Sequence, residues 1–145
     1  MKKKYLFSLY ESLLALFYPA YCPGCNYPLH LHEKRICNVC IGSLSYTRYE
    51  QFEFNPIKQK FAGRFPVDQV FSLVQFKKGT AIQGILHELK YGNHPELGRF
   101  LGNLMGHALR KSDYFRNITH LVPIPLHPKK QLLRGYNQAE QLAIG

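Results

Sequence analysis

The sequence predicts an α/β protein in which a small four-cysteine module precedes the front part of a parallel-sheet domain. Three observations support this fold class. Four cysteines stand in two C-x2-C pairs near the N-terminus. Beyond residue 66, apolar segments typical of strands alternate with segments of helical periodicity. A basic segment containing a glycine follows the last apolar run, and ligands of such sheets bind beyond the carboxyl ends of the strands.

The composition is that of a folded, strongly basic protein. The chain has 145 residues, of which 46% are hydrophobic and 14% aromatic, so it is not a disordered polymer. Its 19 lysines and arginines outnumber 9 acidic residues, which gives a formal net charge of +10. Such an excess favours polyanions, namely phosphorylated metabolites, nucleic acid or acidic membranes. A basic surface without any partner is the alternative.

Residues 1–19 predict an N-terminal amphipathic helix that ends at Pro19. Its lysines and apolar run look like a signal peptide, but Glu11 interrupts the run and no small-x-small cleavage site follows. The run is also too short to span a bilayer. We therefore expect no transmembrane segment and a cytoplasmic location. The helix is expected to pack on the rest of the protein, with contact to a membrane surface as the alternative.

Residues 20–45 predict a zinc ribbon. Two C-x2-C pairs are separated by eleven residues, and each pair can direct two thiolates toward one point. Together they form the tetrahedral four-sulfur set that Zn²⁺ favours, with no open position for a substrate. His30 and His32 are expected to be exposed, because the thiolates fill the site. Two disulfides, a redox dithiol and an iron–sulfur cluster are the alternatives. The expected ligands are Cys22, Cys25, Cys37 and Cys40.

Residues 46–65 are interpreted as a linker. The turn-forming residues Gly63 and Pro66 mark the expected domain boundary at its end. Aromatic and basic residues alternate here, a pattern that can stack on and neutralise single-stranded nucleic acid. The favoured interpretation is a connector whose aromatic side chains pack on the following domain.

Residues 66–145 form the predicted parallel-sheet domain. Strands are expected over 67–76 and 118–125, and helices over 81–91 and from Pro95 to Ala108. In the second of these helices, glycines recur every four residues, which predicts close helix packing. The residues in this line are Gly98, Gly102 and Gly106.

The segment after the second predicted strand is expected to bind an anion. We interpret it as a basic loop that runs to Arg134 and Gly135, followed by a helix capped by Asn137. Backbone N–H groups and a helix dipole at such a junction favour phosphate. An ordinary turn before a helix is the alternative.

In combination, these motifs resemble the ComF family of bacterial competence-associated proteins. The resemblance rests on LFYPAYCPGC and ICNVC around the cysteines, on HELKY at 87–91, on VPIPLHP at 122–128 and on RGYNQ at 134–138. It covers nearly the whole chain. It implies that residues 66–145 are a partial type I phosphoribosyltransferase-like domain, in which phosphoribosyl pyrophosphate binds with the help of Mg²⁺. The implied pyrophosphate-binding residues are Lys129, Lys130, Arg134, Gly135, Tyr136, Asn137 and Gln138.

The chain departs from that family's pattern in one respect. Type I phosphoribosyltransferases carry, further along, a strand that ends in two adjacent acidic residues and a Thr- and Gly-rich loop for the ribose 5-phosphate. After Leu121 the only acidic residue here is Glu140. We therefore expect an incomplete family member, without assignable catalytic residues and inactive by itself.

Three functions remain open from the sequence. The first is a ComF-type protein of DNA uptake that binds phosphoribosyl pyrophosphate or single-stranded DNA. The second is an active phosphoribosyltransferase, a glycosyltransferase, whose remaining residues lie outside this sequence. The third is an adapter without catalysis, in which the zinc ribbon docks a partner such as a DNA helicase and the basic face holds nucleic acid.

Overall fold

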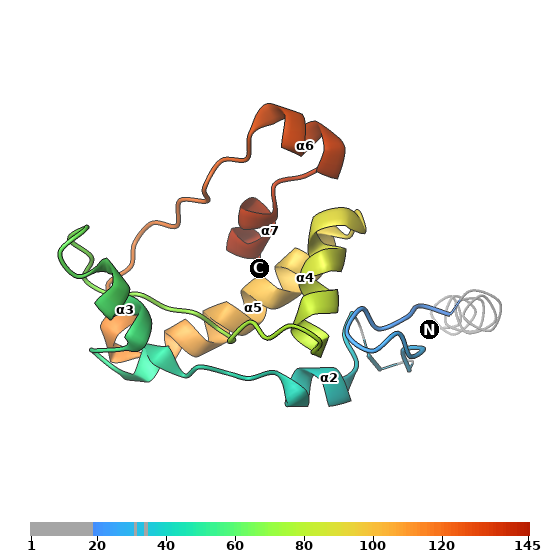
Figure 1. Cartoon of the computed structure of the whole chain (residues 1–145), viewed down its shortest axis with the longest axis horizontal. Helices are drawn as coiled ribbons and strands as arrows, with labels where there is room; N and C mark the ends of the chain where they lie inside the picture. The colour runs from blue at the N-terminus through green and yellow to red at the C-terminus, as the bar shows by residue number, and fades with distance from the viewer. Residues whose placement is uncertain (1–18, 31, 34) are drawn as a thin grey trace, which may run out of the picture.

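The structure, a computed structural model, describes residues 19–30, 32–33 and 35–145 (Figure 1). The helix expected over residues 1–19 lies outside this part of the chain, except for its last residue. Among the described residues, none of the helices has the length and apolar character needed to cross a bilayer.

Short helices joined by extended segments make up the described chain. Two of them, η1 and η2, are 3-10 helices of three residues each. In chain order the elements are α2 (Asn38–Ser43), η1 (Tyr49–Gln51), α3 (Pro56–Phe61), α4 (Ala81–Tyr91), α5 (Pro95–Arg110), η2 (Asp113–Phe115), α6 (Pro128–Arg134) and α7 (Gln138–Ile144).

The two longest helices form where the apolar periodicity predicts them. Helix α4 buries Ile82, Ile85 and Leu89 on one face, which confirms the 3.6-residue spacing. Helix α5 begins with Pro95 in its first turn, where proline lacks only an N–H that would have no helical partner. It buries Leu97 on the same side as its glycines.

Helix α7 packs against two glycines of the line on α5, Gly98 and Gly102. A Cβ atom added at Gly98 would lie 2.7 Å from Cβ of Gln141, and one added at Gly102 would overlap the carbonyl oxygen of Leu142. The backbones of α5 and α7 therefore approach as closely as the glycine spacing predicts (Figure 1). Gly106 has no such neighbour within 4 Å.

The predicted strands do not form in the described part of the chain. Segment 67–76 is extended but pairs with the chain only at one antiparallel bridge, between Tyr46 and Val74. Segment 118–125 is extended and has no strand beside it. A strand requires a neighbour for its N–H and C=O groups, and the prolines at 123 and 125 remove two of the donors. The parallel sheet is thus not present among these residues.

The predicted basic loop before Gly135 is wrong as well, because it is helix α6. Pro128 stands at the first helical position, and the side chain of His127 accepts a hydrogen bond from the N–H of Lys129 (3.3 Å). The residues between them and Gly135 are good helix formers. Gly135 ends the helix with a φ of +76°, a conformation that glycine adopts without strain.

One hydrophobic core joins the four-cysteine module to the helices. The N-terminal side contributes Cys22, Ile36 and Cys40, and the helices contribute Ile85 and Leu97. The contact is tight, because a Cβ added at Gly84 of α4 would overlap the carbonyl oxygen of Pro23. The position of the cysteine-bearing turns is therefore fixed by α4.

Candidate functional site

Two local structures bring the four cysteines together. The first pair lies on a turn that is closed by a hydrogen bond from the N–H of Cys22 to the carbonyl of Tyr27 (2.8 Å) and by the left-handed conformation of Asn26. The second pair lies at the start of α2, where Cys37 is the N-cap residue. Its Sγ accepts a hydrogen bond from the N–H of Cys40 (3.4 Å).

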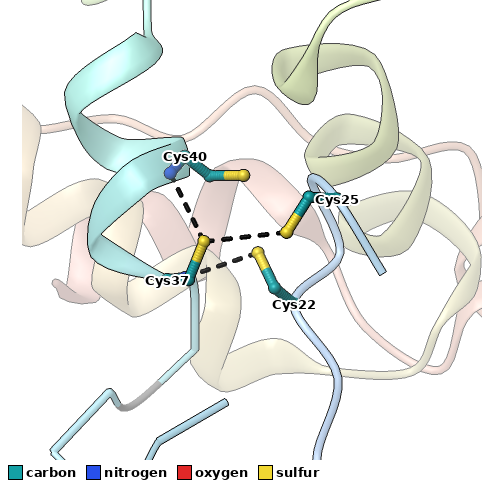
Figure 2. A group of neighbouring side chains, drawn as sticks. All are labelled: Cys22, Cys25, Cys37 and Cys40. Atoms are coloured by element: carbon teal, nitrogen blue, oxygen red, sulfur yellow. Dashed lines mark hydrogen bonds between the residues drawn. The ribbon is translucent and has the colours of Figure 1, made fainter. Parts of the chain in front are cut away.

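The four sulfur atoms converge on one point (Figure 2). All of them lie within 4.8 Å of one another, and Sγ of Cys25 is 3.7 Å from Sγ of Cys37. Four sulfurs at zinc–sulfur bonding distance in a tetrahedron would be about 3.8 Å apart. The cluster therefore matches the size of a four-thiolate metal site.

The thiols of this cluster differ in acidity. Burial raises the pKa of Cys22, but hydrogen bonds from the backbone N–H groups of Cys37, Gly24 and Cys25 outweigh it and lower the value to about 7. Burial and the neighbouring thiols raise the pKa of Cys40 well above the ordinary range. Crowded thiolates repel one another, and a divalent cation at their centre removes that penalty.

The donor set is that of a structural metal centre. Cys22, Cys37 and Cys40 are buried and Cys25 is exposed, so the cluster sits at the surface of the shared core. His30 and His32 are exposed, as predicted, and the group of metal ligands found among the described residues consists of the four cysteines. Four protein ligands leave no open coordination position, so a bound ion would stabilise the fold and perform no catalysis.

Of the residues predicted to bind pyrophosphate, Arg134 and Gln138 form a pair. Arg134 Nη1 donates to Oε1 of Gln138 (3.1 Å), and its guanidinium carbon lies 5.5 Å from the ring centroid of Tyr91. Nε2 of Gln138 is buried without a hydrogen-bond partner in the described structure. Because this amide nitrogen is shielded from solvent, the half-buried guanidinium of Arg134, which has donors besides Nη1, is the group here that could bind an anion.

The side chains of Tyr136 and Asn137 instead form hydrogen bonds within the protein. The Tyr136 hydroxyl donates to the carbonyl of Leu89 (2.6 Å), one of the last carbonyls of α4, which lack a partner within the helix. Burial and the nearby carboxylates of Glu96 and Glu88 raise the pKa of Tyr136. The Asn137 side chain caps α7 by accepting from the N–H of Ala139 (3.0 Å), as the sequence predicts.

Lys129 and Lys130 are exposed in the first turn of α6, whereas Arg134 is its last residue. The seven predicted residues differ in exposure. Lys129, Lys130 and Gly135 are exposed, Arg134 and Gln138 are half-buried, and Tyr136 and Asn137 are buried.

A charged cluster beside this surface has no signal in the sequence. Glu96 Oε1 lies 3.1 Å from Arg35 Nη1 and 3.0 Å from Nδ1 of His94, whose Nε2 lies 3.4 Å from Glu88. Partial burial raises the pKa of Glu96, but its own backbone N–H, His94 and Arg35 lower it overall. Arg35 lies in the spacer between the two cysteine pairs, so the cluster links the four-cysteine module to α5.

The contact between α4 and the RGYNQ segment also escaped sequence reasoning. Spacing alone identifies Tyr91 as a surface residue, which is correct, but it does not reveal that Arg134 lies over its ring. Comparison with known proteins adds no identification, since no family model, curated protein or solved structure matches the chain significantly.

Proposed function

We propose that this protein is a zinc-binding ComF-type protein of DNA uptake that holds a phosphorylated ligand where α4 ends against residues 134–138. One observation carries the proposal. Two motifs far apart in the sequence, HELKY and RGYNQ, meet through the Tyr136–Leu89 hydrogen bond and the Arg134–Tyr91 contact. The guanidinium of Arg134 stands where these two motifs meet, and its hydrogen bond to Gln138 uses only Nη1.

The ligand class follows from the chemistry of these groups. A guanidinium offers a planar fork of donors that fits phosphate oxygens, and the excess of positive charge attracts polyanions. Phosphoribosyl pyrophosphate, with Mg²⁺ supplied by solvent, is the small ligand that fits the family resemblance. We place no catalytic residue on this chain, because the acidic pair that would hold the ribose hydroxyls is absent from its sequence.

The test is calorimetric titration of the zinc-loaded protein with phosphoribosyl pyrophosphate and Mg²⁺. Arg134→Ala is expected to weaken binding about tenfold or more, because it removes charge-assisted hydrogen bonds. Arg110→Ala is the matched control, since it removes an exposed arginine from the end of α5. Equal affinities for the wild type and Arg134→Ala would show that this segment is structural only.

A second candidate function is a zinc-ribbon adapter without catalysis, and the exposed side chains of Tyr27 and Val39 on the four-cysteine module favour it. A partner such as a DNA helicase would cover them. Val39→Asp is expected to abolish binding to a purified competence helicase in a surface-immobilised assay. Binding that survives this substitution would exclude the module as the adapter surface.

A further inference from the structure

The solvent-exposed side of α4 carries a row of aromatic and basic side chains. Gln83, His87 and Tyr91 follow one another at four-residue spacing, so they share one face of the helix. Together with neighbouring side chains they border an open groove of about 450 Å³. The bordering residues are Phe76, Gln83, Leu86, His87, Lys90 and Tyr91.

The aromatic groups of this groove are displayed rather than buried. Phe76 is 59% exposed and Tyr91 is 64% exposed, so neither contributes much to the hydrophobic core. The rings of His87 and Tyr91 lie 5.0 Å apart, and the guanidinium of Arg134 adjoins the Tyr91 ring at 5.5 Å. Three flat groups from two segments thus lie near one another, and Phe76 borders the same groove.

Basic residues adjoin the flat groups at both ends of α4. Lys77 and Lys78 follow Phe76 at one end, and Lys90 and Arg134 lie at the other. The acidic residue of α4, Glu88, lines a different cavity together with His94. The groove therefore combines stacking surfaces with cations and has no carboxylate in its lining.

We propose that this groove, lined by Phe76, His87, Lys90 and Tyr91 and adjoined by Arg134, binds single-stranded nucleic acid. Bases would stack on Phe76, on His87 and on the outer face of the guanidinium, while the lysines would neutralise the phosphates. The eleven residues of α4 span about 16 Å, which suits two or three nucleotides rather than one. A duplex keeps its base faces stacked inside and could use only the charges. The inference rests on the proposed role in DNA uptake and assigns its nucleic-acid site.

The experiment measures fluorescence anisotropy of labelled oligothymidylate and oligouridylate with the full, zinc-loaded chain at several salt concentrations. Phe76→Ala is expected to weaken binding about tenfold, the typical loss for one stacked base. Tyr91→Ala is expected to weaken it by a similar factor, because it removes the ring against which His87 and Arg134 lie. Tyr91→Phe keeps the ring and should retain wild-type affinity. Lys90→Gln should lower the salt dependence by roughly 0.7 of a log unit per log unit of salt, whereas Lys60→Gln on α3 should not.

Three results would overturn the inference. They are absence of binding by the wild type at low salt, unchanged affinity in both Phe76→Ala and Tyr91→Ala, and tighter binding of polyglutamate than of either oligonucleotide. Preference between the two oligonucleotides assigns DNA or RNA as the natural ligand. Phe76 lies outside the RGYNQ segment, so titration of Phe76→Ala with phosphoribosyl pyrophosphate separates the two proposals. Retained pyrophosphate binding without oligonucleotide binding in the wild type would contradict only this inference, and the reverse would contradict only the small-ligand proposal.

Discussion

The four-cysteine module and segment 118–125 both carry apolar side chains, but these side chains lie in opposite environments. Cys22, Cys37 and Cys40 are buried in the core. Leu121, Val122 and Ile124 are 71%, 85% and 79% exposed. The two cysteine turns are held by local hydrogen bonds, and their four sulfur atoms lie close together. An isolated extended segment has no neighbour that shields its side chains and backbone from solvent. Local hydrogen bonds can stabilise a short turn, whereas an apolar sequence typical of strands does not bury itself without a neighbouring strand.

The largest effect is predicted for a substitution in the four-cysteine module. Cys37→Ser removes a ligand, an N-cap acceptor and a buried thiol at once. Structural zinc sites contribute on the order of 10 kcal/mol to folding, so we expect loss of bound metal and a large fall in melting temperature. Metal content is measured by mass spectrometry and unfolding by circular dichroism. His32→Ala, in the exposed spacer, is the control, and stoichiometric zinc in Cys37→Ser would refute the four-sulfur assignment.

A second pair of variants sharpens the comparison within α5. Gly102→Ala is expected to cost about 1–3 kcal/mol, because the added methyl group meets the backbone of α7. Gly106→Ala, one turn further on and beside Val122, is expected to stabilise by up to about 1 kcal/mol, because alanine favours helix and the site is open. Denaturant unfolding measures both. Equal effects would contradict the close α5–α7 contact.

A smaller effect is expected where the RGYNQ segment joins α4. Tyr136→Phe removes the hydrogen bond to the carbonyl of Leu89 and should destabilise the protein by about 1 kcal/mol. Tyr114→Phe is the matched control, because Tyr114 is exposed. Chemical denaturation of the three proteins gives the comparison. An indistinguishable midpoint for wild type and Tyr136→Phe would mean that this contact does not hold the segment.

The smallest effect is expected on the exposed segment. Ile124→Ser should change the free energy of unfolding by less than about 0.5 kcal/mol, because its side chain is already in water. The same unfolding assay applied to Ile85→Ala, fully buried in α4, should show a loss of about 2–5 kcal/mol. A large loss in Ile124→Ser would indicate that the segment is covered in solution.

Sequence reasoning succeeded where the determinants are close together in the chain. The C-x2-C spacing predicted the cysteine cluster, apolar periodicity predicted the buried face of α4, and Asn137 was correctly identified as a helix cap. It failed over 67–76 and 118–125, because strand formation depends on partners that local composition does not specify. It also failed at α6, where the weight given to charge and glycine obscured a run of good helix formers after Pro128.

The candidate ligand surface was only partly predictable for the same reason. Arg134 and Gln138 are only four positions apart, but they belong to α6 and α7, and their pairing depends on the left-handed turn at Gly135 between the two helices. The contacts of Arg134 with Tyr91 and of Arg35 with Glu96 join residues more than 40 positions apart. Such contacts follow from how α4 and α5 pack, which no short motif encodes.

The fit of Pro23 against Gly84 limits how this protein can be divided. A fragment that ends before α4 would expose Ile36 and the buried cysteines to solvent, and a fragment that begins at α4 would uncover Ile85. Neither part could be grafted onto another scaffold as an independent cassette. A larger residue at Gly84 would require a compensating change in the Pro23–Gly24 turn. These positions are therefore structurally coupled despite the sixty residues between them.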